Sequence, residues 1–256
     1  MKIASWNVNS IKVRLPRVIK WLKKEGPDIL CLQELKCVEE KFPYSEFQSL
    51  GYHALVFGQK TYNGVAILSR IPPKQEVLGL SNSENDPQAR FVAAKYGNAH
   101  VISAYIPNGS EVGSEKYAYK LDWYQRLVKH LETHYQKDDL LLLCGDFNVA
   151  PENRDVHNLE TWRESVLCHE DARGALSRIL EWGLVDTFRE YESEAGFYSW
   201  WDYRRLGFQR NDGLRIDFVL ATKPLAKVLQ KAWIERDERK GEKPSDHVPV
   251  MAEFDL

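Results

Sequence analysis

The stretch Leu140-Leu141-Leu142-Leu143-Cys144-Gly145-Asp146-Phe147-Asn148 combines a continuous apolar run with a polar end. A short apolar run of this kind is typical of a strand that is buried on both faces. The acid and the amide stand two residues apart directly after the run, so their side chains project to the same side if the chain stays extended. The stretch therefore predicts a buried strand that presents Asp146 and Asn148 at its end.

The same pattern of short apolar runs recurs along the chain. The other runs are Ile3–Trp6, Ile29–Leu32, Val65–Leu68, Val101–Tyr105, Ile216–Leu220 and Val248–Phe254. Apolar residues at three- and four-residue steps predict helices over 13–22, 117–131 and 176–180. Pro16 is tolerated if the first helix begins near Val13, and Gly183 stops the last one. Strands outnumber helices, and short turns such as Asn63-Gly64 join some of them. This predicts an α/β fold of two packed sheets with helices outside.

Length and composition limit the possibilities further. The chain has 256 residues, 43% of them hydrophobic, with no repeat or linker, which predicts a single domain over 1–256. The net charge of -2 argues against a protein that binds nucleic acid by bulk positive charge, but not against a carboxylate site with a basic rim. Four cysteines without a CxxC pair argue against zinc. No apolar run could span a membrane and no signal peptide is evident, so we expect a cytoplasmic protein.

Polar side chains at the ends of the other strands supply what metal-assisted phosphoryl transfer needs. These residues are Asn7, Glu34, Tyr105, Asp217, Asp246 and His247. Mg²⁺ prefers oxygen ligands and needs only one or two carboxylates, of which Glu34 is the best candidate. Asp146 could orient or deprotonate a water molecule, and Asn148 could bind a phosphate oxygen. His247 could donate to the phosphate if Asp217 or Asp246 holds its ring, and the Tyr105 hydroxyl could stabilise the leaving oxygen.

Each of these residues also has a structural explanation. Asn7 and Asn148 are common in turns and caps, and Ser245-Asp246-His247 could be a polar loop. A carboxylate at Glu34, directly after a buried strand, is harder to explain without a partner. The structural explanations must all hold independently, whereas a shared site explains the residues together.

At these residues the sequence resembles the exonuclease III family of abasic-site endonucleases, within the endonuclease/exonuclease/phosphatase superfamily. The matching segments, in the family's order, are Trp6–Ser10, Leu32–Lys36, Tyr62–Ala66, Tyr105–Gly109, Gly145–Asn148, Ala150-Pro151, Gly213–Asp217 and Ser245–Val250. Gly-Asp-Phe-Asn and Ser-Asp-His are typical of the whole superfamily. Leu-Gln-Glu-Leu-Lys and Gly-Leu-Arg-Ile-Asp narrow the resemblance to the abasic endonuclease branch.

The resemblance implies a four-layer α/β sandwich of two packed mixed β-sheets flanked by helices, with Mg²⁺ as the metal and Mn²⁺ as a substitute. It implies metal contacts from Asn7, Glu34, Asp146, Asn148 and Asp246, and catalytic roles for Tyr105, Asp146, Asn148, Asp217 and His247. Asp217 would orient His247. Some relatives carry Asp where this chain has Asn9, a weaker ligand, so Asn9 is left out of the metal site.

A segment rich in aromatic residues and arginines, Tyr198–Arg205, is the candidate DNA-facing surface, with Arg210 and Arg215 after it. By resemblance, Trp200, Leu214 and Ile216 would form an apolar pocket for a flipped-out baseless sugar, and Asn108 and Arg204 would also bind substrate. Lys36, Lys60, Lys116 and Lys120 would extend the basic rim. The alternative is an aromatic strand in the core with solvated arginines nearby.

These expectations combine into a DNA-repair phosphodiesterase that incises duplex DNA 5′ to abasic sites, acts on recessed or blocked 3′ ends, and is monomeric. The rivals are a phosphatase or sphingomyelinase-type esterase, and a DNA-binding module without activity. The balance of endonuclease and exonuclease activity, for which the Leu167–Asp171 loop is a candidate determinant, stays open. So do the number of metal ions and the choice of general base between Asp146 and the His247–Asp217 pair.

Overall fold

Two six-stranded sheets form the centre of the computed structural model, which describes residues 1–80 and 86–256 apart from the side chain of Arg205. The first sheet contains β1 (Lys2–Asn7), β2 (Ile29–Gln33), β3 (His53–Phe57), β4 (Val65–Ser69), β11 (Leu229–Ile234) and β12 (Val250–Phe254). The second contains β5 (Lys74–Leu78), β6 (Phe91–Tyr96), β7 (Ala99–Tyr105), β8 (Leu141–Asp146), β9 (Leu184–Asp186) and β10 (Asp217–Thr222).

The two sheets share one pattern of strand pairing. Their orders are β11-β12-β1-β2-β4-β3 and β5-β6-β7-β8-β10-β9. Each has one parallel pair at its centre, β1 with β2 and β7 with β8, and every other pairing is antiparallel. Helices α1 (Ile11–Glu25) and α3 (Glu115–His134) make the two crossovers that parallel pairing requires. The carboxyl ends of both central pairs therefore lie at one edge of the sandwich.

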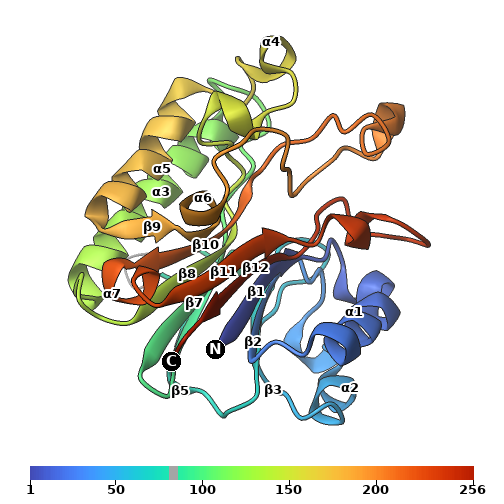
Figure 1. The fold of residues 1–256 in the computed structure, drawn as a ribbon, viewed down its shortest axis with the longest axis vertical. Coiled ribbons are helices and arrows are strands. Elements are labelled where there is room, and N and C mark those ends of the chain that lie inside the picture. Colours follow the sequence, from blue (N-terminus) through green and yellow to red (C-terminus); the bar gives the residue numbers. More distant parts are fainter. Residues whose placement is uncertain (81–85) are drawn as a thin grey trace.

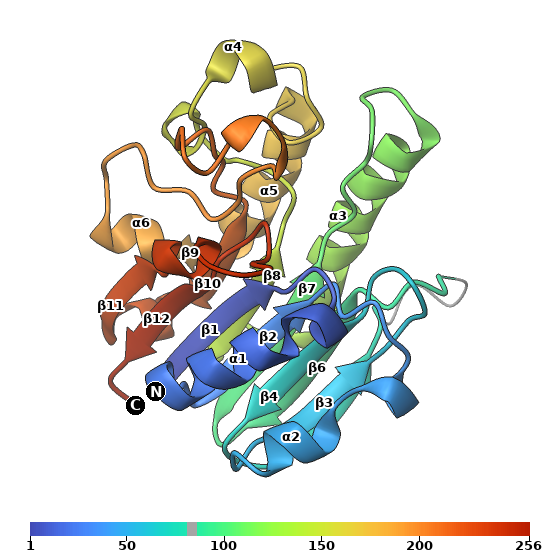
Figure 2. The same cartoon turned by 90° about the vertical axis from the view of Figure 1, so that its right-hand side faces the viewer.

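Helices cover the outer faces of both sheets. Figures 1 and 2 show α1 and α2 (Tyr44–Gln48) on one side, and α3 and α5 (Glu170–Trp182) on the other. The shorter helices are α4 (Leu159–Trp162), α6 (Thr187–Tyr191) and α7 (Lys223–Ala226), and the 3₁₀ turns are η1 (Glu39–Lys41), η2 (Asn153–Asp155), η3 (Arg204–Leu206) and η4 (Arg236–Arg239). The result is four layers, helix, sheet, sheet, helix.

Alternating strand residues explain this layering. In β2, Ile29 and Cys31 face the second sheet, while Leu30 and Leu32 pack under α1. In β8, Cys144 joins the interior between the sheets and Leu143 packs against the outer helices. Both faces of the central strands are buried, which is why these strands read as continuous apolar runs.

Gly145 allows β7 and β8 to lie close together just before the end of the strand. A Cβ atom there would stand 1.9 Å from Ala104 O. No side chain can replace glycine without moving the strand that carries Asp146.

The fold predicted from the sequence is confirmed, with local differences. The first helix begins at Ile11, so Pro16 lies inside α1 and removes one backbone hydrogen bond from it. Asn63-Gly64 ends a seven-residue connection, 58–64, between β3 and β4 and is not a two-residue hairpin turn. The strands that the apolar runs did not indicate are mainly peripheral, such as the largely exposed β5.

Candidate active site at the strand ends

The predicted site residues of both sheets meet at the edge where the central parallel strands end. Asn7 ends β1 and Glu34 follows β2, while Tyr105 ends β7 and Asp146 ends β8. Asp217 begins the antiparallel β10, directly opposite Asp146 in the strand register. His247 lies three residues before β12 and pairs with Trp200 in an isolated bridge. The pairing of the strands therefore gathers six predicted residues around one point.

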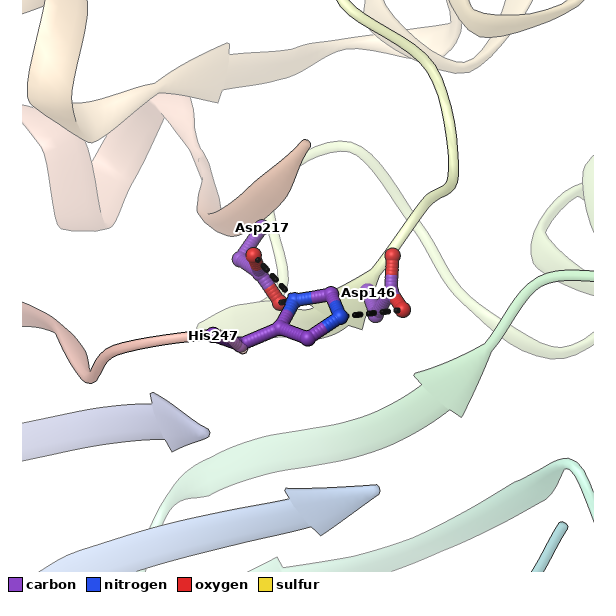
Figure 3. A group of neighbouring side chains, drawn as sticks. All are labelled: Asp146, Asp217 and His247. Carbon is purple, nitrogen blue, oxygen red and sulfur yellow. Dashed lines mark hydrogen bonds and ion pairs between the residues drawn. The ribbon is translucent and has the colours of Figure 1, made fainter. Parts of the chain in front are cut away.

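His247 lies between two buried carboxylates (Figure 3). Its Nδ1 is 2.9 Å from Asp217 Oδ2, and its Nε2 is 3.7 Å from Asp146 Oδ2. All three side chains are nearly inaccessible, with exposed fractions of 4% for His247, 1% for Asp146 and 0% for Asp217. The Ser199 hydroxyl donates to Asp217 Oδ2 at 2.6 Å and fixes that carboxylate. Asp217 thus orients the ring so that Nε2 faces Asp146.

Burial and charge move the protonation equilibria of this group in opposite directions. Burial raises the pKa of Asp146 to about 7, with Asp217 adding to the increase and His247 opposing it. Burial works against the charged imidazolium, but Asp217 and Asp146 together raise the pKa of His247 to about 10. The two carboxylates therefore favour the protonated His247, which can donate, while burial makes Asp146 more basic than an ordinary aspartate.

A second carboxylate, Glu34, is held by three donors, one from its own loop and two from the ends of β1 and β7. Lys36 Nζ lies 2.8 Å from Oε2, the Tyr105 hydroxyl donates to Oε1 at 2.6 Å, and Asn7 Nδ2 donates to Oε1 at 3.2 Å. Burial opposes ionisation of Glu34, but Lys36 outweighs it and the pKa lies below its ordinary value. Burial, Glu34 and Asp146 raise the pKa of Tyr105 well above 10, so its hydroxyl remains a donor.

Asp246 extends the carboxylate cluster toward the neighbouring cavity. Its Oδ1 accepts from Asn9 Nδ2 at 2.8 Å, and its Oδ2 accepts from Trp200 Nε1 at 3.0 Å. Burial opposes ionisation of Asp246, but His247 and these two donors lower its pKa. Asn9 Oδ1 accepts from Lys36 Nζ at 2.6 Å. The Asn9 side chain therefore connects Lys36 to Asp246 at the border of the site.

The amide of Asn148 is placed by the neighbouring loop and by a buried lysine. Asn148 Oδ1 accepts from Asn108 Nδ2 at 2.9 Å, and its Nδ2 donates to Ile106 O at 3.0 Å. Lys120 Nζ donates to the carbonyl oxygens of Asn108, Asn148 and Val166 at 3.1, 2.7 and 2.6 Å. Lys120 is 0% exposed, so the prediction that it belongs to the basic rim is wrong. Burial lowers its pKa to about 7, and its three protons tie together three loops.

Backbone strain gathers at the same edge. Asn9, Ser10, Glu34, Lys36 and Asn148 all have positive φ, with values of 43°, 92°, 52°, 54° and 51°. Each non-glycine residue in this region costs roughly 1–3 kcal/mol. The surrounding hydrogen bonds hold these residues in place, as where Asn148 N donates to Asp146 Oδ1 at 2.9 Å. All five residues lie within three positions of the ends of β1, β2 and β8.

A cavity of about 450 Å³ opens beside this cluster. Trp200 and Leu167 line it together with Asn108 and Arg204. Leu214 and Ile216 are almost fully buried, and Leu214 pairs with Trp200 through backbone hydrogen bonds, so these two residues support the tryptophan from behind. Arg204 is exposed and paired with Asp202 at 2.8 Å. Leu167 belongs to the loop that the sequence analysis named as a candidate determinant of the balance between endonuclease and exonuclease activity.

Other parts of the predicted DNA-facing surface are buried. Arg215 is 1% exposed and pairs with Asp155 at 2.7 Å and Asp186 at 2.7 Å, so its prediction as part of a basic surface is wrong. Trp201 is likewise fully buried. The side chain of Arg205 lies outside the described residues. The sequence alone could not distinguish these buried residues from Trp200. Whether an arginine is solvated or forms a buried ion pair depends on partners elsewhere in the chain, here Asp155 and Asp186 for Arg215.

The donor set suits a hard divalent cation. Asn7 Nδ2, a partly positive group, bridges Glu34 Oε1 and Asp146 Oδ2 at 3.2 and 2.9 Å, so this point between two carboxylates attracts positive charge. Asp146, Asp217 and His247 also offer ligand atoms within 4.8 Å of one another. Both ring nitrogens of His247 already face carboxylates, however. The oxygen-rich space between Glu34, Asn7 and Asp146 fits Mg²⁺ or Mn²⁺ better.

Comparison with known proteins agrees with this geometry. The model of the Endonuclease/Exonuclease/phosphatase family matches residues 4–247. The chain belongs to this family. It is similar to an exodeoxyribonuclease III from Haemophilus influenzae, 36% identical over 99% of this chain and 100% of that protein. The family resemblance seen in the sequence is thereby confirmed.

Solved structures place the chain among the same family members. An AP endonuclease from Archaeoglobus fulgidus is 44% identical, with a TM-score of 0.97 and all of both chains covered. A 3′ phosphatase from Neisseria, bound to a product DNA hairpin, is 42% identical with a TM-score of 0.96, again over the whole of both chains. In the part of the present chain that the structure describes, no helix is long and apolar enough to cross a membrane.

Proposed function

We propose that this protein is a metal-dependent DNA-repair phosphodiesterase, and that residues 1–256 form one catalytic domain. It hydrolyses the DNA backbone 5′ to abasic sites and also acts on recessed or blocked 3′ ends. The relatives carry these activities in their names: exodeoxyribonuclease III, AP endonuclease and 3′ phosphatase. The observation that carries the proposal is the meeting of Glu34, Asp146 and the Asp217–His247 pair at one sheet edge.

The residues at this edge divide the chemistry of hydrolysis among themselves. Bound Mg²⁺ would supply charge stabilisation at a phosphoryl oxygen, with Glu34 and Asn7 as its main protein contacts. Asp146, at a pKa of about 7, accepts a proton from the attacking water, whose oxygen forms the new bond to phosphorus. Protonated His247 and Asn148 Nδ2 donate to the phosphate oxygens. The P–O3′ bond breaks, and the Tyr105 hydroxyl, which keeps its proton at neutral pH, would give that proton to the departing 3′ oxygen, so that a 3′-hydroxyl is left.

The cavity beside the site fits a sugar without a base. Trp200 provides an apolar wall, and its indole is fixed by the hydrogen bond to Asp246. Asn108 and Arg204 also line the cavity and would contact the flanking backbone. A missing base lowers the cost of flipping a nucleotide into such a cavity. We further propose that the protein acts as a cytoplasmic monomer.

The test is a gel assay on an end-labelled duplex with one stable abasic analogue, beside an intact duplex, with Mg²⁺ or with EDTA. A single Mg²⁺-dependent cut at the lesion supports the abasic endonuclease. A ladder descending from the 3′ end of both duplexes shows mainly exonuclease activity. Absence of cleavage by folded, metal-loaded protein rejects the DNA-repair assignment. Small phosphodiesters would then be the next substrates to assay.

A further inference from the structure

A second cavity, lined by basic residues and called the basic cavity below, lies outside the active site between the segments 202–209 and 236–244. Its volume is about 600 Å³. Arg236, Arg239 and Lys240 line it, together with the rings of Tyr203 and Phe208. Asp202 and Tyr203, which belong to the segment predicted to face DNA, line this basic cavity, but none of the residues predicted individually to bind substrate or metal does.

Two arginines in the basic cavity are held by aromatic rings and carbonyl oxygens and not by a direct carboxylate partner. The Arg239 guanidinium lies 4.7 Å from the Tyr203 ring centre and 5.7 Å from that of Phe208. Arg236 lies 4.4 Å from the same Phe208 ring. Within the described part of the chain, neither arginine forms an ion pair. Their hydrogen bonds, 3.3–3.5 Å long, run to carbonyl oxygens and to the side chain of Asn211.

Arg239 is the more unusual of the two because it is 8% exposed. Its Nε is buried and has no hydrogen-bond partner among the described residues. A buried charge without an ion-pair partner is costly, and here a second cation, Arg236, lies against the same Phe208 ring. The nearby acids pair with other residues: Asp202, which also lines the cavity, with Arg204 at 2.8 Å, Glu238 with Arg17 at 3.1 Å, and Asp237 with Lys240 at 2.6 Å. The charge of Asp246 acts on Arg239 without forming an ion pair with it. An anion in the basic cavity would relieve this imbalance.

The chemistry of the basic cavity matches a phosphate diester. Guanidinium groups bind phosphate oxygens through paired N–H donors, and aromatic rings hold those groups in place. The neighbourhood points to the phosphate of a long polymer. Tyr203 follows Trp200 by three residues, and Pro244 precedes Asp246 by two. Three residues span at most about 10 Å. Phosphates on one DNA strand advance about 3.4 Å per nucleotide along the axis, so this span corresponds to about three nucleotides.

We propose that the basic cavity binds a backbone phosphate of the same DNA duplex whose scissile phosphate lies in the active site. Arg236 and Arg239 would be its ligands. This inference rests on the proposed function, because it takes duplex DNA as the substrate. It adds a site that acts on affinity and register without touching the reacting atoms.

The experiment measures binding of a fluorescent duplex with one abasic analogue, in EDTA, between about 50 and about 200 mM NaCl. Arg236→Ala is the main variant because Arg236 is exposed. Arg178→Ala is the matched control: it removes one exposed arginine from α5, beside a different cavity. Arg236→Lys keeps the charge but loses the paired N–H donors of the guanidinium. Arg239→Gln, checked by thermal unfolding, is a second variant, and Arg236→Ala alone decides the question if it unfolds.

In Arg236→Ala we expect the slope of log Kd against log salt to become shallower by about 0.9, the value for one lost phosphate contact. Kd at low salt should rise several-fold, Arg236→Lys should recover part of the slope, and Arg178→Ala should match the wild type. Replacing single phosphates by neutral methylphosphonates should then identify one position whose loss weakens the wild type but not Arg236→Ala.

Equal slopes for Arg236→Ala and Arg178→Ala would overturn the inference. The two proposals fail separately. If wild-type protein cuts the abasic duplex but the slopes are equal, only the second phosphate site is rejected. If the slope changes but the duplex is never cut, the proposed enzymatic function is rejected and the phosphate site stands.

Discussion

Two buried aspartates nine residues apart, Asp146 and Asp155, occupy opposite electrostatic environments. Asp155 is fully buried and pairs with Arg215 and Arg189 at 2.7 and 2.5 Å. Burial opposes its ionisation, but Arg215 and Arg189 lower its pKa. Asp146 is equally buried and has no arginine or lysine partner in the described residues, only His247 at 3.7 Å and two amide donors. Its pKa rises to about 7.

The difference separates a carboxylate that stabilises the fold from one that serves a reaction. Asp155 and its arginines join η2 to β9 and α6, so the ion pairs connect parts of the protein. Asp146 is left incompletely balanced, which costs stability and leaves a group that can exchange protons near neutral pH. The largest effects on activity and on stability should therefore come from different residues.

The largest expected effect is on turnover. Glu34→Gln and Asp146→Asn should each reduce kcat on an abasic duplex by at least about a thousandfold, roughly 4 kcal/mol in the barrier. The unfolding midpoint of Asp146→Asn in urea should not fall, because this substitution removes a poorly compensated charge. That of Glu34→Gln should fall modestly, because the ion pair with Lys36 is lost, but the protein should still fold. Normal turnover by either folded variant would contradict the site.

Arg215→Met should instead destabilise the fold by about 3–5 kcal/mol, because it leaves Asp155 and Asp186 buried without their shared cation. Urea denaturation measures the loss, and activity per folded molecule should stay near that of the wild type. Arg204→Met, at an exposed pair with Asp202, is the control and should change stability by less than about 0.5 kcal/mol. Equal effects of both would remove the contrast between buried and exposed pairs.

Asp217→Asn should lower kcat about a hundredfold without a comparable change in KM, because His247 would lose the carboxylate that orients and charges it. Single-turnover cleavage measures the step. Ser199→Ala, which removes only the hydroxyl bound to Asp217, should cost less than about tenfold. A larger loss in Ser199→Ala than in Asp217→Asn would show that the His247–Asp217 contact is not what matters.

The smallest effects should appear in the pH dependence of stability, measured without metal. The pKa of Asp155 is lowered, so its stabilising contribution is present above the ordinary value of 3.8 and disappears as the pH falls through the lower folded value. The pKa of Asp146 is raised, so the stability cost of its ionisation grows between about pH 4 and about pH 7 and keeps its full value above pH 7. Asp146→Asn should match the wild type near pH 4 and exceed it above pH 7, whereas Asp155→Asn should be less stable at neutral pH and converge in acid.

Strand ends were predictable from the sequence because they combine two strong local signals. The apolar runs located the central strands, and the polar residues after them, such as Glu34 and Asp146, marked the edge. Strand pairing then brought them together, as expected for parallel pairs. Whether each residue plays its predicted role stays a prediction for the kinetic tests above.

Burial of long charged side chains could not be predicted. Lys120 reads as one more polar residue on a helix, and Arg215 reads as part of a basic segment. Both are buried by partners far away in the chain: three carbonyl oxygens from separate loops for Lys120, and Asp155 and Asp186 for Arg215. Peripheral strands such as β5 were missed for a related reason, since an exposed edge strand carries little apolar periodicity.

Lys120 has a consequence for how this protein could acquire a new substrate range. Its ammonium holds the β7–α3 loop, the end of β8 and the loop before α5 through backbone carbonyls alone. Side chains on those loops other than Asn108 and Asn148 can therefore be exchanged without loss of these contacts, whereas an insertion that moves the carbonyl of Val166 would disturb Asn148 as well. Grafting of loops from relatives should succeed when the length between Ala150 and Val166 is kept, and fail when that length changes.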